Sequence, residues 1–213
     1  MSKSANTSPS RLLWIDELTR EDHYYLDEGD ECSYWGEYTA RQGFSHSETN
    51  SLISNLKKSV DRKGFPEWRY KGQAIKRVAE LFLQGIGADK LPILTFVPVP
   101  PSKAKSDPGY DDRLIAVLNE MARTVPIDIR EILIQPHSVD ASHLSDQRPK
   151  PEDIAKGYTI DRTLIAKPRD FVVIVDDVLT TGAHFKAAKS VLQTVWPNIP
   201  FIGLFVARRA IIN

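Results

Sequence analysis

Apolar and polar residues alternate in two different patterns along this chain of 213 residues. Between residues 47 and 84 the apolar positions recur at helical spacing, as Leu52, Ile53, Leu56 and Val60 do. This spacing predicts amphipathic helices over 47–60 and about 68–84, with a breaker over 61–66 between them. Residues 11–46 mix aromatic and acidic side chains, and they predict only a short strand or two with turns.

From residue 91 onward the pattern changes to apolar runs separated by polar stretches. The runs 93–99, 171–175 and 201–207 predict strands buried on both faces, and 127–134 alternates as a strand does. Helices are expected from Asp111 and Asp112 onward and over 183–195. The polar stretch 136–157 is expected to be a long loop. Strands that alternate with helices predict an α/β fold with a mainly parallel sheet flanked by helices.

Charge and cysteine content narrow the class of protein. Lys plus Arg and Asp plus Glu both number 28, and a net charge of zero does not indicate nucleic-acid binding. Cys32 is the single cysteine, which excludes an internal disulfide and favours a reducing, cytoplasmic compartment. No apolar run approaches the roughly 20 residues that span a bilayer, and the polar first ten residues predict no signal peptide and no membrane partner.

The clearest chemical pattern follows the apolar run 171–175. Asp176 and Asp177 come next, at the start of a loop expected over 176–182 that leads into the helix expected over 183–195. Such a loop offers backbone N–H groups, hydroxyls and a helix N-terminus, which together suit a phosphate. Carboxylates beside a phosphate suit a ligand with vicinal hydroxyls, such as a ribose 5-phosphate. The alternative is that the acidic pair only ends a strand and caps a helix.

The run 172–182, Val-Val-Ile-Val-Asp-Asp-Val-Leu-Thr-Thr-Gly, resembles the phosphoribosyl pyrophosphate (PRPP) motif of type I phosphoribosyltransferases. The resemblance implies that the two aspartates hold the ribose hydroxyls and help to bind Mg²⁺, directly or through water. It implies that the 5-phosphate lies against a loop of seven residues, namely Val178, Leu179, Thr180, Thr181, Gly182, Ala183 and His184. His184 stands where relatives carry Thr or Ser, so its imidazole either donates to the phosphate or turns outward.

Two further segments gain a role through the resemblance. The loop after strand 93–99 is where relatives bind pyrophosphate, which implies Ser102 and Lys103, helped by Lys105 and Arg113. The alternative is a proline-rich surface turn with solvated lysines. The stretch 142–158 is where relatives carry a flexible lid that excludes water, and its cations are Arg148, Lys150 and Lys156. A disordered charged loop is the alternative there.

Three segments, 51–58, 97–101 and 154–158, make the chain similar to the ComF-type phosphoribosyltransferase-like family. Many members of that family begin with a cysteine-rich zinc finger, which Cys32 alone cannot form. The resemblance implies an N-terminal tail and hood-like segment over 1–70 and a phosphoribosyltransferase-like core over 71–213. Aromatic residues of the first part either stack on a planar base or form a local core or dimer contact; they are Trp14, Tyr24, Tyr25, Tyr34, Trp35 and Trp68.

We therefore predict a Mg²⁺-dependent phosphoribosyltransferase that joins a nucleobase-like acceptor to PRPP and releases pyrophosphate. The residues expected to act in catalysis are Asp176, Asp177, Lys103 and Arg148. Some purine-specific relatives place an acidic base where this chain has Thr180, which argues weakly against that mechanism. The main alternative is a non-catalytic PRPP-binding regulator or DNA-processing accessory protein, and a third is a phosphoribosyl-ester hydrolase. A homodimer is compatible with all three.

Overall fold

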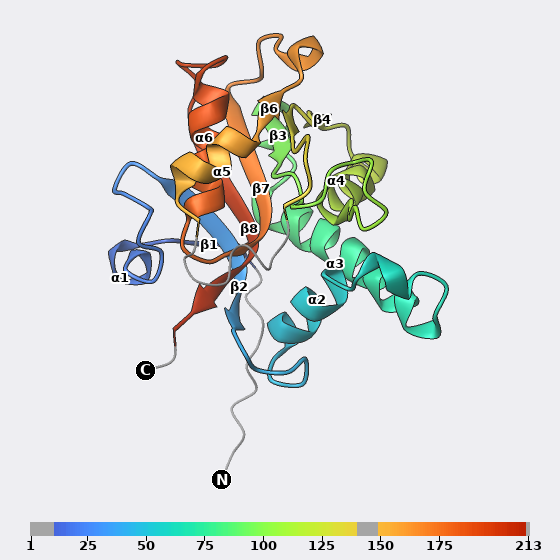
Figure 1. Ribbon diagram of the computed structural model, residues 1–213. Helices are drawn as coiled ribbons and strands as arrows, with labels where there is room; N and C mark the ends of the chain where they lie inside the picture. Colours follow the sequence, from blue (N-terminus) through green and yellow to red (C-terminus); the bar gives the residue numbers. More distant parts are fainter. Residues whose placement is uncertain (1–10, 140–148, 212–213) are drawn as a thin grey trace.

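A six-stranded sheet forms the centre of the protein, whose computed structural model describes residues 11–139 and 149–211 (Figure 1). The strand order is β1-β2-β8-β7-β3-β4, and all neighbouring pairs are parallel except β1 with β2. The bounds are β1 Leu13–Trp14, β2 Glu31–Thr39, β3 Leu94–Pro98, β4 Asp128–Ile129, β7 Phe171–Leu179 and β8 Phe201–Ala210. A separate antiparallel pair joins β5 (Leu133–Ile134) to β6 (Thr159–Ile160).

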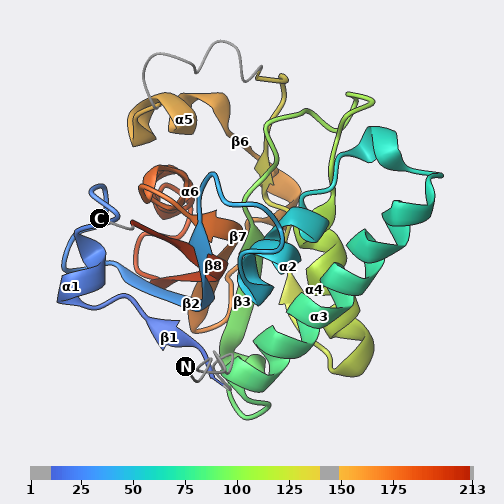
Figure 2. The same ribbon diagram turned by 90° about the horizontal axis from the view of Figure 1, so that it is seen from below.

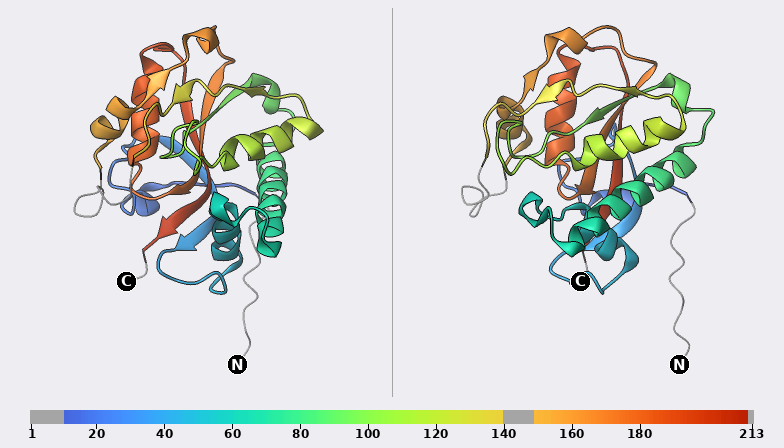
Figure 3. Two further views of the ribbon diagram at one scale, coloured as in Figure 1. Left: turned by 45° about the vertical axis from the view of Figure 1, so that its right-hand side comes forward. Right: turned by 90° about the vertical axis from the view of Figure 1, so that its right-hand side faces the viewer.

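Helices cover both faces of this sheet, which confirms the predicted α/β class. Figure 2 shows α2 (Glu48–Leu56), α3 (Arg69–Ile86) and α4 (Arg113–Thr124) on one side, with α5 (Pro151–Gly157) and α6 (Ala183–Gln193) on the other. Helix α4 packs beside α3 (Figure 3), and α5 packs on α6. The short helix α1 (Glu17–Arg20) precedes β2. Within the described residues, no helix combines the length and the apolar character that crossing a bilayer requires.

Burial explains why the central strands form where the apolar runs predict them. Val172, Val173, Ile174 and Val175 are all buried, because helices cover both faces of β7. The helix expected over 47–60 begins as α2 after Ser47, whose hydroxyl accepts the Asn50 N–H at 3.0 Å.

The predicted strand 127–134 is wrong as a single element. Its first part pairs with β3 as β4, and its last part pairs with β6 in the other sheet as β5. Between them the Arg130 N–H bonds to the Phe96 carbonyl, and the Ile132 carbonyl accepts from Asp161. The chain therefore leaves one sheet and enters the other within a few residues.

The predicted loop 136–157 is wrong at its C-terminal end, where α5 forms. Pro151 occupies the first turn together with Glu152 and Asp153, and Lys156 lies in the last turn. Proline at the start, acids in the first turn and a cation in the last turn are all favourable helix features.

The N-terminal segment contributes more to the sheet than a strand or two with turns. Strand β2 is nine residues long and pairs with β8 along almost its whole length, from Glu31 with Ile202 to Thr39 with Ala210. The central sheet thus draws on residues from both sides of position 70.

The direction of the chain connections reverses between two central strands, β3 and β7. Strands β3 and β7 are neighbours, but the chain continues from β3 outward to β4 and from β7 in the opposite direction to β8. In open α/β sheets, ligands bind beyond the carboxyl ends of the strands at such a switch point. Asp176 and Asp177 lie there, near the end of β7.

Candidate functional site

Asp176 and Asp177 point to opposite faces of the sheet, as consecutive residues of a strand do. The Asp177 carboxylate meets cations from α2 and α4, whereas Asp176 borders the cleft beside β3 and a hollow at the start of α6. The Asp177 N–H donates to Asp176 Oδ1 at 2.7 Å, which fixes the two carboxyl groups relative to each other. The adjacent acids therefore occupy two different environments.

Both oxygens of Asp177 are engaged by cations. Lys57 Nζ lies 2.9 Å from Oδ1, and Arg113 donates to Oδ2 through Nε at 2.7 Å. The Asp177 residue is 3% exposed. Burial acts to raise its pKa, but the charges of Lys57 and Arg113 outweigh burial and lower the pKa to about 2. Asp177 is therefore ionised at neutral pH, and its ion pairs hold α2 and α4 at the end of β7.

The same network extends into the interior between the helices. Arg113 also pairs with Asp111 at 3.0 Å, and Asp111 accepts from Lys71 Nζ at 2.8 Å. Lys71 is almost fully buried and donates further to the carbonyls of Leu56 and Lys58. Each buried charge has a partner, which is the condition for burying charge at tolerable cost.

Asp176 has the opposite electrostatic character. It is half-buried, and no cation of the described chain lies within ion-pair distance of it. Burial and the neighbouring Asp177 charge raise the pKa of Asp176 to about 6. A carboxylate held at the mouth of a cleft without a cation is poised to accept hydrogen bonds from a ligand.

The loop after β7 has the backbone geometry that its sequence requires. Gly182 precedes α6 with φ of +85°, a region that favours glycine. The loop is shorter than predicted, because Val178 and Leu179 end β7 and Ala183 begins α6. The side chains of these three residues are buried, so they offer a ligand only their backbone. Thr180 is exposed, whereas Thr181 is buried.

His184 lies in the first turn of α6 and is exposed. Its Nδ1 is 3.1 Å from the hydroxyl of Tyr158, the buried residue that follows α5. Burial and the Asp176 charge raise the pKa of Tyr158, so its hydroxyl stays protonated. His184 therefore links the 149–158 segment to the loop and borders the hollow beside Asp176.

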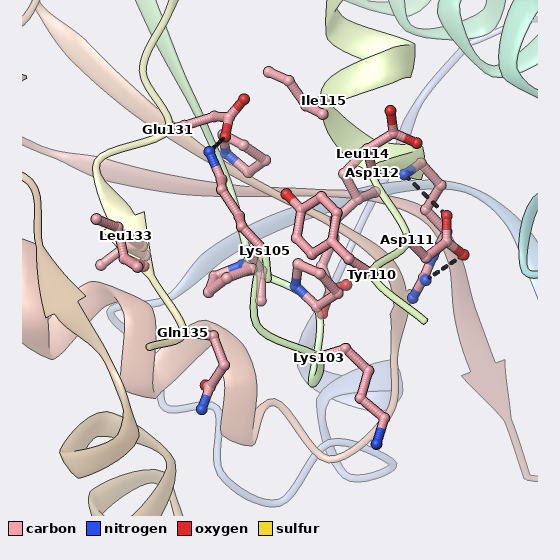
Figure 4. A pocket seen from close by; sticks show the side chains of 17 residues that line it. Lys103, Lys105, Tyr110, Asp111, Asp112, Leu114, Ile115, Glu131, Leu133 and Gln135 are labelled. Atoms are coloured by element: carbon pink, nitrogen blue, oxygen red, sulfur yellow. Dashed lines mark hydrogen bonds and ion pairs between the residues drawn. The ribbon is translucent and has the colours of Figure 1, made fainter. Parts of the chain in front are cut away.

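A cleft of about 570 Å³, including space open to solvent, lies on the other side of Asp176 (Figure 4). Lys103 and Lys105 border it from the loop after β3 (Figure 4). Arg113 borders it from α4. Lys105 pairs with Glu131 across the cleft, and Lys103 lies 3.9 Å from Asp107. Ser102 is exposed, and its carbonyl accepts the Val139 N–H at 2.8 Å. The cationic loop predicted from the sequence therefore borders the same carboxylate as the 178–184 loop.

The predicted lid lies only partly within the described structure. Arg148 is outside the described residues. Lys150 is exposed at the start of α5, and Lys156 pairs with Asp153 at 2.8 Å on the outer surface of that helix. Neither lysine borders the cleft.

The N-terminal aromatic residues do not gather into one surface. Tyr34 and Trp35 are buried in the core on β2, whereas Trp14 and Tyr24 are more than half exposed. Tyr25 and Trp68 are half-buried, at separate places along the chain. Tyr34 and Trp35 belong to the main core, and not to the local core or dimer contact that was the alternative to base stacking.

The acidic residues suit only one mode of magnesium binding. The described part of the chain contains no group of three or more His, Cys, Asp or Glu placed to hold a metal ion. Asp177 has both oxygens bound to cations, so of the two adjacent acids of β7 only Asp176 borders the cleft, which Asp111, Asp112 and Glu131 also line. Mg²⁺ commonly keeps several waters and takes one or two carboxylates together with substrate phosphates. The site fits a cation that arrives with a phosphorylated ligand.

Two residues of the site escape the sequence analysis. Lys57 is 120 positions from Asp177, and its only sequence signal is a pair of lysines at the end of a predicted helix. His23 is fully buried, and its Nδ1 bonds to the Thr180 carbonyl, 157 positions away. No local pattern indicates contacts of this range.

Comparison with known proteins adds no relative: no protein-family model and no curated protein matches this sequence.

Proposed function

We propose that this protein binds PRPP and transfers its phosphoribosyl group to a nucleobase-like acceptor with release of pyrophosphate. The position of Asp176 supports the proposal most strongly. Its carboxylate borders both the hollow along the 178–184 loop and the cleft that Lys103 and Lys105 line. A ligand that suits this arrangement carries hydroxyls in its middle and an anionic group at each end. PRPP has this form.

In the proposed complex, the 5-phosphate lies against the N–H groups at the start of α6, which have no acceptor within the helix. Asp176 accepts hydrogen bonds from the ribose hydroxyls. Lys103 and Lys105 receive the pyrophosphate and neutralise its charge as it leaves. Asp177 acts indirectly, because it holds α2 and α4 in place through Lys57 and Arg113.

The proposed reaction breaks the bond between carbon 1 of the ribose and the pyrophosphate oxygen, which keeps the electron pair. A nitrogen lone pair of the acceptor forms the new bond to carbon 1, and the nitrogen then loses its proton to solvent. Positive charge develops on the sugar ring, and the Asp176 carboxylate beside it stabilises that charge. Asp176 would hold a magnesium ion that arrives with the ligand, and that ion would further neutralise the charge of the leaving group.

A second candidate function is PRPP binding without transfer, as in a regulatory protein. This function is favoured because the lysines of the cleft already have acidic neighbours: Lys105 pairs with Glu131, and Lys103 lies near Asp107. In that case the ligand competes with these acids but meets no catalytic group for the acceptor. Both candidates use the same ligand and the same Asp176.

Pyrophosphate release from PRPP and magnesium, measured with a panel of nitrogenous bases, tests the proposal. We expect release with at least one base, and loss of that release in Asp176→Asn. Asp170→Asn is the matched control, because Asp170 is exposed just before the other end of β7. Saturable PRPP binding without release for any base would favour the binding protein. Absence of both would overturn both candidates.

A further inference from the structure

The segment between α1 and β2 lies directly against the loop that opens α6. His23 Nδ1 bonds to the Thr180 carbonyl, and the Tyr25 N–H donates to the Thr181 carbonyl at 3.0 Å. The side chain of Leu26 fills the space that a Cβ on Gly182 would need, because its Cδ2 would lie 2.8 Å from that atom. Three successive loop residues are therefore contacted by one short N-terminal segment.

The hydrogen bond fixes the protonation of the His23 ring. A carbonyl oxygen only accepts, so Nδ1 carries the proton. Burial lowers the pKa of His23, which favours the neutral ring and leaves Nε2 unprotonated. Nε2 is buried and has no hydrogen-bond partner within the described residues. Burying the unpaired Nε2 costs stability, so the single hydrogen bond of the ring calls for an explanation.

The geometry of the peptide bond shows what the bond secures. The carbonyl of one residue and the N–H of the next share a plane and point in opposite directions when the peptide is trans, as every described peptide is. The Thr180 and Thr181 carbonyls face His23 and Tyr25. The N–H groups of Thr181 and Gly182 therefore face away from the N-terminal segment.

These two N–H groups come immediately before the first turn of α6, whose own N–H groups have no acceptor within the helix. A run of successive N–H groups that faces one side forms an anion-binding nest. Asp176, Thr180 and His184 border a hollow along this loop.

Ion pairs keep the N-terminal segment in register with α6. Lys186 lies 2.6 Å from Asp27 and 2.7 Å from Asp30, and Lys189 lies 2.6 Å from the other oxygen of Asp30. Asp30 is buried, so these contacts are shielded from solvent. These ion pairs therefore fix the position of the N-terminal segment relative to α6, the helix that follows the loop.

We propose that His23 is a positioning residue for a phosphate ester: it holds the Thr180 carbonyl so that the N–H groups of Thr181 and Gly182 face the phosphate. The ligand class is a sugar monophosphate, and the inference rests on the proposed role of the 178–184 loop. Through His23, the N-terminal segment would help to orient the phosphate-binding loop, a role that the sequence of the loop does not indicate.

A matched pair of variants at His23 tests this role. Asn places an amide nitrogen where Nδ1 lies and keeps the donor, whereas Leu fills similar space without one. Calorimetric titration with ribose 5-phosphate should show about tenfold weaker binding for His23→Leu, which corresponds to roughly 1.4 kcal/mol. His23→Asn should stay within about twofold of the wild type, on the same scale.

A control must separate loss of stability from loss of positioning. Asp16 caps α1 in the same segment through the Thr19 N–H at 2.8 Å and does not touch the loop. Asp16→Ala should lower stability while leaving the affinity for ribose 5-phosphate unchanged. Wild-type affinity in a folded His23→Leu protein would overturn the inference.

If His23→Leu does not fold, nitrogen NMR of the wild type decides the matter. We expect the Nδ1-protonated tautomer of His23, and shifts of the Thr181 and Gly182 amide signals on addition of ribose 5-phosphate. The other tautomer, or unaffected amides, would refute the inference. The role of His23 and the proposed transfer reaction can fail independently. If His23→Leu weakens binding but the wild type releases no pyrophosphate, only the transfer reaction is refuted. If His23→Leu releases pyrophosphate at the wild-type rate, only the role of His23 is refuted.

Discussion

Replacing Asp176 with Asn should make the protein more stable while removing its proposed function. Burial and the Asp177 charge raise the pKa of Asp176 from 3.8 to about 6. Between those values the unfolded chain loses the proton while the folded protein keeps it, so stability falls as pH rises from about 4 to 6. A difference of about 2 pH units at roughly 1.4 kcal/mol each gives about 3 kcal/mol.

The asparagine variant avoids this loss because it carries no charge. Its amide oxygen retains the acceptor for the Asp177 N–H, which donates to Asp176 Oδ1 at 2.7 Å in the wild type. We therefore expect Asp176→Asn to exceed the wild type by about 3 kcal/mol above pH 6, and the gain to fade as pH falls toward 4. The free energy of unfolding in urea at pH 7.5, 5 and 4 measures it.

Asp170→Asn is the matched control, since it removes an exposed carboxylate just before the other end of β7 and should bring no comparable gain. An Asp176→Asn protein no more stable than the wild type at pH 7.5 would refute the reasoning. So would a gain of the same size at pH 4.

Three other substitutions or reagents probe the same structure. Arg113→Met leaves the buried Asp177 carboxylate without one cation and should cost about 3–5 kcal/mol in urea unfolding, so a loss below 1 kcal/mol would contradict the network. Gly182→Ala places a side chain on a backbone with φ of +85° and should destabilise the fold by about 1–3 kcal/mol, which a lower melting temperature would show. An unchanged melting temperature would contradict this backbone conformation. Cys32 is buried and burial raises its pKa, so a thiol reagent should label it only on unfolding, and rapid labelling of the native protein would argue against the placement of β2.

The sequence predicts the parts of this fold that local patterns determine. The apolar runs that become β3, β7 and β8 are buried on both faces, and helical spacing correctly indicates α2 and α3. Strand β2 is less visible, because acidic residues flank its buried Cys32, Tyr34 and Trp35. Its place beside β8 is a pairing between distant segments that no local pattern encodes.

The site divides in the same way. The order of residues from Asp176 to His184 indicates a strand, a loop and a helix, and the structure has these elements, but β7 continues past the two acids to Leu179. The sequence does not show that Asp177 turns toward Lys57 and Arg113 while Asp176 faces the cleft. That difference depends on which helices cover each face of the sheet.

Calorimetric titration with ribose 5-phosphate tests most directly whether Asp176 and the loop before α6 form a sugar-phosphate site. We predict saturable binding at one site per chain, strong weakening in Asp176→Asn, and no change in Asp170→Asn. Equal binding by wild type and Asp176→Asn, or no heat of binding from a folded wild-type protein, would contradict it.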